Sequence, residues 1–204
     1  DLEFNRENAF RILSKHFNVK TCDTVNEEFK KGINKRSSSA NIGKKYFRKK
    51  ANRANSKYKD YLNQKVLSLY YKKPFGHNDE GERDLVCAAL ELNYSGLYDR
   101  VIILSDDLTA IDYFISSVNK DFKFGEIWSA LDMIIYMYMH INEISLLETE
   151  EAIRDLASKE SISAKKFKSN KYINDQTARQ VMVGQYLRRL KKVNILKQGL
   201  PTPK

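Results

Sequence analysis

The chain has 204 residues, 42% of them hydrophobic, which is long and apolar enough to bury a core and argues against a disordered chain. Its formal net charge of +10 indicates a polyanionic partner. The longest apolar run, residues 133–139, is far shorter than the ~20 residues that span a bilayer, which excludes a transmembrane helix. The charged start of the chain predicts no signal peptide. Cys22 and Cys87 lie in apolar patterns without metal-ligand spacing, so we expect buried free thiols and a cytoplasmic protein.

The elements predicted before residue 30 are two helices with a short strand between them. Apolar spacing predicts a helix over residues 6–17, and residues 19–22 form a plausible strand. Thr24 followed by Glu27 has the spacing of a capping box, so the second helix is predicted to start at Thr24. That role accounts for Glu27. Glu28 is either a site residue or a solvated surface carboxylate.

Residues 30–73 form a strongly basic segment, with fifteen Lys or Arg residues and one acid, Asp60. Residues 58–70 follow helical spacing, so the segment is predicted to be a helical protrusion. Cations interleaved with aromatic residues favour a groove that follows a phosphate backbone and stacks on unpaired bases. The alternative is a solvated basic hairpin. The candidate nucleic-acid-binding residues are Lys44, Lys45, Tyr46, Arg48, Lys49, Lys50 and Arg53.

Residues 81–107 are the stretch around which the rest of the chain is organised. An amphipathic helix is predicted from Gly81, and the apolar run at residues 101–104 is typical of a buried strand. Ligands of open α/β sheets bind at the carboxyl ends of strands, and a divalent cation offsets the repulsion between acids gathered there. The acids that flank these elements are Glu82 and Asp84 at the mouth of the helix, and Asp106 and Asp107 after the strand.

The remaining predicted elements are mainly helical. Residues 122–124 are predicted to be a short edge strand that Gly125 breaks, and apolar spacing predicts a helix over residues 126–138. Ser145 and Glu148 have capping-box spacing at the start of a further helix. Residues 165–204 contain eleven cations and one acid, and they are predicted to form a basic helix that could extend a nucleic-acid surface.

Three patterns together resemble the PIN-domain nucleases. The first is a helix opened by acids, here Glu82-Arg83-Asp84, and the second is a strand that ends in Ser105-Asp106-Asp107. The third is a helix pattern of the form V-x-x-E-[LF], which places Glu28 at the acidic position. The resemblance implies a PIN-like three-layer α/β fold, with a central, mainly parallel sheet flanked by helices. The expected division is a PIN-like domain over residues 1–160, which contains the basic insert, and a basic helical extension over residues 161–204.

The resemblance also implies a metal-dependent nuclease, an endoribonuclease that hydrolyses phosphodiester bonds with Mg²⁺ or Mn²⁺. Its catalytic residues would be Glu28, Asp84 and Asp107, with Glu82 and Asp106 as further metal ligands. The expected partner is nucleic acid, with RNA favoured over DNA, together with a second copy of the chain or an inhibitory protein; no membrane partner is expected. The alternative is a non-catalytic PIN-like module that binds RNA or protein.

One part of the family pattern is not matched. PIN domains begin with a strand that ends in an aspartate, and no apolar strand precedes the first predicted helix here. Either that strand lies upstream of Asp1, or Asp1 is itself the aspartate, or the site is incomplete.

Overall fold

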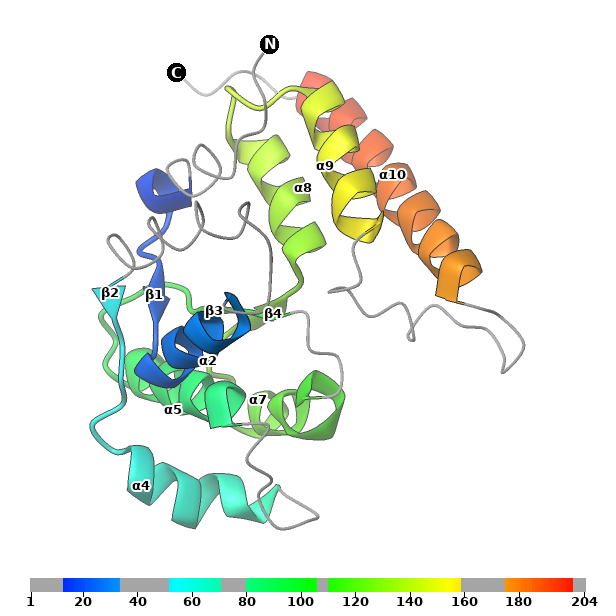
Figure 1. Ribbon diagram of the computed structural model, residues 1–204. Coiled ribbons are helices and arrows are strands. Elements are labelled where there is room, and N and C mark those ends of the chain that lie inside the picture. Colours follow the sequence, from blue (N-terminus) through cyan, green and yellow to red (C-terminus); the bar gives the residue numbers. More distant parts are fainter. Residues whose placement is uncertain (1–12, 34–51, 71–79, 106–109, 159–174, 200–204) are drawn as a thin grey trace. The chain divides into compact units, whose positions relative to one another are not determined.

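The structure is a computed structural model in which the chain divides into two compact units (Figure 1). The first contains residues 1–103 and 109–127, and the second contains residues 104–108 and 128–204. The described part of the chain is mostly helical with short strands, so the fold is a mixed α/β one. The residues that the structure describes are 13–33, 52–70, 80–105, 110–158 and 175–199.

A small parallel sheet joins two distant parts of the first unit. β1 (Lys20–Thr21) pairs with β2 (Asn52–Arg53), with Lys20 opposite Asn52 and Thr21 opposite Arg53. The strand predicted at residues 19–22 is therefore confirmed. The prediction that the whole basic segment is helical is wrong at β2. Asn52 and Arg53 are a strand there, because their backbone pairs with the backbone of β1.

The helical segments of the first unit include the pattern predicted at residues 58–70 and the helix predicted from Gly81. The spacing seen at residues 58–70 is confirmed as helical, but Leu67 is fully buried in the core, so this part of the basic segment is not a protrusion. Apolar side chains of α5, among them Val86 and Cys87, fill the same core. The elements are α2 (Asp23–Ile33), α4 (Lys59–Tyr61), the π-helical turn η1 (Leu62–Val66), the 3-10 turn η2 (Leu67–Leu69) and α5 (Glu80–Tyr94).

The strand predicted at residues 101–104 is present as β3 (Ile102–Leu104), and it pairs with β4 (Glu126–Trp128). The strand predicted at residues 122–124 is wrong, because Phe122 ends helix α7 (Ser116–Phe122), which follows the π-helical turn η4 (Ile111–Ile115). Gly125 allows β4 to approach β3. A Cβ atom at this glycine would lie 2.2 Å from the carbonyl oxygen of Val101, which accepts a hydrogen bond from the Glu126 N–H.

Three helices pack together in the second unit: α8 (Ala130–His140), α9 (Leu146–Ser158) and α10 (Asp175–Gly199). The helix predicted over residues 126–138 begins later, at Ala130, because Ser129 caps it and the preceding residues form β4. The capping box predicted at Ser145 and Glu148 is confirmed by two reciprocal backbone bonds. The core side chains that these helices share are Leu131, Ile134, Ile135, Tyr138, Ile153, Met182 and Leu190.

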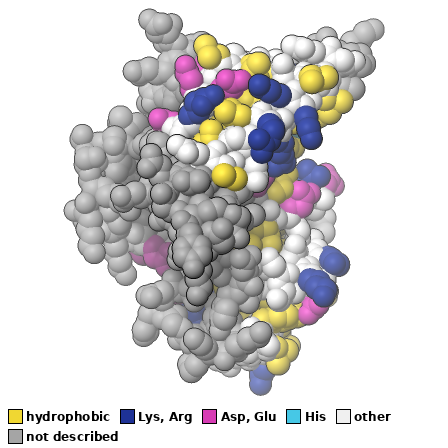
Figure 2. All heavy atoms as spheres, turned by 90° about the vertical axis from the view of Figure 1, so that its right-hand side faces the viewer, with side chains coloured by type: hydrophobic (Ala, Val, Ile, Leu, Met, Phe, Trp, Pro, Cys, Tyr) yellow, Lys and Arg dark blue, Asp and Glu magenta, His cyan; other side chains and the backbone are white. Residues whose placement is uncertain are grey.

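Helix α10 carries much of the charge that the sequence places near the C-terminus. Figure 2 shows Lys and Arg side chains gathered, with hydrophobic side chains between them, on the face that carries α10. The exposed cations of this helix include Arg188, Arg189, Lys191 and Lys192, and Ile195 and Leu196 are exposed beside them. In the described part of the chain, α10 and every other helix are too short or too polar to cross a bilayer.

Candidate functional site

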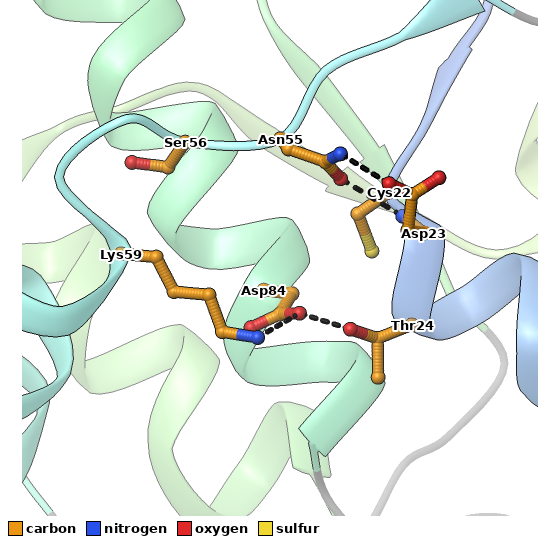
Figure 3. A pocket seen from close by; sticks show the side chains of 7 residues that line it. All are labelled: Cys22, Asp23, Thr24, Asn55, Ser56, Lys59 and Asp84. Carbon is orange, nitrogen blue, oxygen red and sulfur yellow. Dashed lines mark hydrogen bonds and ion pairs between the residues drawn. The ribbon is translucent and has the colours of Figure 1, made fainter.

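A polar pocket of about 260 Å³ lies in the first unit, where α2, α5 and the start of α4 come together (Figure 3). It contains Asp84, one of the acids that the sequence singles out. Most of its other lining residues come from segments that the sequence patterns did not connect with Asp84. The lining residues are Cys22, Asp23, Thr24, Asn55, Ser56, Lys59 and Asp84.

Asp84 is the buried acid of this pocket, with only 7% of its side chain exposed. Its Oδ2 atom accepts a hydrogen bond from the Thr24 hydroxyl and lies 2.7 Å from Nζ of Lys59. Its Oδ1 atom is also buried but has no hydrogen-bond partner among the described residues. A buried carboxylate oxygen without a partner is costly, so a cation or a hydrogen-bond donor at this atom would be favourable.

Lys59 is the cation of the pocket and the first residue of α4, and its side chain is 37% exposed. Partial burial alone would lower the pKa of Lys59, but the hydrogen bond and the negative charge of Asp84 outweigh burial and raise it. The ammonium group therefore remains charged at neutral pH. It neutralises Asp84 within the pocket.

Glu28 lies on the same helix–helix contact as Asp84. On α2, Glu28 is four residues after Thr24, so both side chains share one face. Glu28 meets α5 at Gly81, three residues before Asp84. A Cβ atom at Gly81 would lie 2.7 Å from Oε2 of Glu28, so a larger residue here would require the Glu28 carboxylate to shift. The α2–α5 contact thus carries both acids, with Glu28 beside Gly81 and Asp84 three residues further along α5.

Glu82 has a different position from Asp84, although both belong to the first turns of α5. Two residues correspond to about 200° of rotation on an ideal helix, so the two side chains point in different directions. Asp84 lines the pocket and Glu82 does not.

Asp23 lines the pocket together with Asn55, and Arg53 lies next to Asp23 without lining the pocket. Nε of Arg53 lies 3.1 Å from Oδ1 of Asp23, and the Asn55 amide donates to Oδ2 of Asp23 at 2.5 Å. Oδ1 of Asn55 in turn accepts from the backbone N–H of Asp23. Arg53 was predicted to contact nucleic acid. In the structure its guanidinium group forms an ion pair with Asp23, the first residue of α2.

Several predicted residues fall outside the described part of the chain. They include Asp1 and both acids that follow β3, Asp106 and Asp107. The remaining predicted nucleic-acid-binding residues also lie outside it: Lys44, Lys45, Tyr46, Arg48, Lys49 and Lys50.

Thr24 and Lys59 are the residues that sequence analysis missed. Thr24 was predicted to cap α2, but the helix begins one residue earlier, at Asp23, and the Thr24 hydroxyl donates to Asp84 instead. Lys59 was counted only as one of many cations in the basic segment. Neither role leaves a local pattern in the sequence, because the partner is 60 residues away for Thr24 and 25 for Lys59.

Both cysteines are buried free thiols, as the sequence predicted. Burial is the main cause that raises the pKa of Cys22, and the negative charges of Asp84 and Glu28 add to it. Burial, with the charge of Asp84, raises the pKa of Cys87 to about 12. Both thiols therefore stay protonated at neutral pH, which makes them poor nucleophiles and poor metal ligands.

The described residues do not by themselves form a metal site. Among them, no group of three or more His, Cys, Asp or Glu side chains is arranged to hold a metal ion. The unpartnered Oδ1 of Asp84 and the nearby carboxylate of Glu28 nevertheless fit a hard cation, which prefers oxygen ligands. In comparisons with known proteins, no family model, no curated protein and no solved structure matches this chain.

Proposed function

We propose that this chain is a PIN-like, metal-dependent nuclease that cleaves RNA. The supporting observation is Asp84, a buried carboxylate at the start of α5 with one oxygen that has no hydrogen-bond partner among the described residues. Such an oxygen is explained if a cation completes its coordination during function. The resemblance to the PIN nucleases suggests the same residue from its sequence pattern.

Glu28 and Asp84 would hold Mg²⁺ or Mn²⁺ together with Asp107, and Glu82 and Asp106 would lie beside them. When bound, the ion would activate a water molecule and offset the charge on the leaving oxygen of the phosphodiester. The chain's own contribution is to orient the ligands. Thr24 and Lys59 hold Oδ2 of Asp84, and Gly81 leaves the space in which the Glu28 carboxylate lies.

The finer fold that we propose with this function is the three-layer PIN-like arrangement with one central parallel sheet, although the described strands form two separate two-stranded sheets, β1–β2 and β3–β4. Its support is the parallel pairing of β1 with β2 and the strand β3 placed directly before Asp106 and Asp107. The Ser105 N–H donates to the carbonyl of Trp128, and the Glu126 N–H donates to that of Val101. These bonds advance in the same direction along β3 and β4, as in a parallel pair.

RNA is proposed as the substrate because of the charge of the chain and the resemblance to the family. The net charge of +10 and the fifteen cations of residues 30–73 suit a polyanion. Aromatic residues among those cations, such as Tyr46 and Phe47, suit unpaired bases.

A cleavage assay tests the proposal. A short single-stranded RNA is incubated with the chain and Mn²⁺ or Mg²⁺, with a chelator as the first control. Asp84→Asn should abolish cleavage, whereas Asp132→Asn, which removes the same charge from α8, should leave it unchanged. Metal-dependent cleavage that is equal in both variants would contradict the proposal, because Asp84 would then have no part in it.

A second candidate function is a non-catalytic PIN-like module that binds RNA or a protein. The observation that favours it is the ion pair, since Lys59 already neutralises Asp84 without a metal. Binding without metal-dependent cleavage would support this candidate. Neutralising Lys44, Lys45, Arg48, Lys49, Lys50 and Arg53 should then flatten the log–log salt dependence of RNA affinity by up to about 4, at roughly 0.7 per phosphate contact. Because Arg53 already pairs with Asp23, its share should be the smallest.

A further inference from the structure

The Asp84–Lys59 ion pair occupies the acid that the proposed nuclease needs for its metal. We propose that Lys59 is an internal counter-ion of Asp84, which a divalent cation has to displace before it can bind. This inference depends on the proposed function, since it concerns the metal of that same site. Under this proposal Lys59 opposes metal binding, whereas the residues named above would hold the ion.

The first argument is charge compensation at Asp84. The Lys59 ammonium lies 2.7 Å from Oδ2, and the Thr24 hydroxyl donates to the same oxygen. Asp84 therefore already has a full positive charge at hydrogen-bonding distance. A metal ion would gain less at this carboxylate than at one whose charge is not compensated, because it exchanges one cation for another.

The second argument is access. The Asp84 side chain is almost wholly buried and its Oδ1 atom is shielded from solvent, whereas the Lys59 side chain is 37% exposed. Figure 3 shows the Lys59 side chain extended across the pocket, with its ammonium group beside the Asp84 carboxylate. An ion in the pocket thus finds the ammonium group already beside the acid.

The third argument is repulsion between the two cations. A metal ion bound to either oxygen of Asp84 at roughly 2 Å would lie within about 7 Å of an ammonium group that stayed on Oδ2. Two positive charges at that distance in a buried environment repel each other strongly. Lys59 can leave because its side chain is long and partly exposed, so the ammonium group can move into solvent when the ion arrives.

The experiment measures Mn²⁺ affinity directly, from the electron paramagnetic resonance signal of free Mn²⁺, with no cleavage step. Lys59→Met removes the ammonium group but keeps a side chain of similar length. It should tighten Mn²⁺ binding roughly tenfold, the size expected for losing one competing charge-assisted hydrogen bond. Lys57→Met is the matched control. It removes the same charge two residues earlier, from an exposed side chain that does not line the pocket, and should change the affinity less than about twofold.

Three results separate this inference from the proposed function. If the wild-type chain binds Mn²⁺ and Lys59→Met binds it no more tightly, the inference is wrong and the proposed metal site still stands. If neither protein binds Mn²⁺, the proposed metal site is wrong and the inference falls with it. In the third case, the gain from Lys59→Met disappears when Asp84→Asn is added, which supports the inference by locating the competition at Asp84.

A measurement on the wild-type chain follows the Lys59 ammonium group itself. Lysine labelled with ¹³C at Cε gives one signal per residue, and the signal absent from Lys59→Met identifies Lys59. Titration with Mg²⁺ should move this signal to the position of solvent-exposed lysines as the ammonium group leaves Asp84. A Lys59 signal that stays unchanged at saturating Mg²⁺ would overturn the inference.

Discussion

Asp84 in the first unit and Asp132 in the second are both aspartates paired with a cation and a hydroxyl group, yet their second oxygens differ. Oδ2 of Asp132 accepts from the Ser129 hydroxyl at 2.6 Å and from the Ser129 backbone N–H at 3.1 Å. Its Oδ1 atom pairs with the Arg189 guanidinium group. In Asp84, the cation and the hydroxyl share one oxygen, and the other oxygen has no hydrogen-bond partner in the described part of the chain.

This difference separates a structural acid from a candidate functional one. Asp132 completes a capping box at the start of α8 and ties that helix to α10. Its side chain is 27% exposed, and all of its contacts favour the charged form. Asp84 is more deeply buried and only half satisfied, so it costs stability that the proposed metal would recover. Four measurements test this contrast.

The largest effect is expected for metal binding. Asp84→Asn should weaken Mn²⁺ binding about 100-fold or more, since losing even a group that only supports a ligand costs about 10–100-fold. Asp132→Asn should leave the Mn²⁺ affinity unchanged, because both of its oxygens already have protein partners. Titration followed by the signal of free Mn²⁺ measures both. Equal loss in the two variants would show that Asp84 has no special role.

The next effect concerns the two hydroxyl groups. Thr24→Val removes a hydrogen bond to a buried carboxylate and should lower the free energy of unfolding by about 2 kcal/mol. Ser129→Ala removes an N-cap and should lower it by about 1 kcal/mol. Urea denaturation of each variant gives both values. If Ser129→Ala proved clearly the more damaging change, burial would not be what distinguishes the two aspartates.

A smaller effect on metal affinity is expected at Gly81. The methyl group of Gly81→Ala would lie 2.7 Å from Oε2 of Glu28 and push this carboxylate aside. Mn²⁺ affinity should fall roughly tenfold. The free energy of unfolding should not fall, because alanine favours a helix by about 1 kcal/mol over glycine and the Glu28 carboxylate can move.

Gly184→Ala on α10 is the control for that change. The nearest atom to a Cβ there is Nη1 of Arg188 at 3.9 Å, which is an ordinary contact. This variant should gain helix stability without any change in Mn²⁺ affinity. A Gly81→Ala chain with wild-type affinity would exclude Glu28 as a metal ligand.

The smallest effect is the pH dependence of Asp132. Burial opposes its charged form, but the Ser129 hydrogen bonds and the charge of Arg189 outweigh burial and lower the pKa of Asp132 below its ordinary value of 3.8. The charged carboxylate therefore stabilises the fold above that ordinary value, and this contribution is lost as the pH falls through the folded-state pKa. Urea denaturation should show Asp132→Asn to be less stable than wild type at neutral pH, with the gap closing in acid. A gap that persists when the carboxylate is protonated would show that the charge is not its cause.

The sequence by itself determined the features that depend on residues within one or two helical turns. The apolar spacing of residues 81–92 and the run at residues 101–104 located α5 and β3. The Ser145–Glu148 spacing located the start of α9. The acidic pattern at the start of α5 also singled out Asp84, which the structure places in the polar pocket.

Only the tertiary structure decided what surrounds Asp84. Thr24 has the sequence context of a helix cap and Lys59 that of one cation among many, and both reach Asp84 because α2 and α4 fold against α5. Asn52 and Arg53 form a strand because β1 offers unpaired backbone groups, not because their own sequence favours one. Contacts between residues 25 or 60 positions apart leave no periodic pattern in a sequence, since they depend on how separate elements pack and not on the local chain.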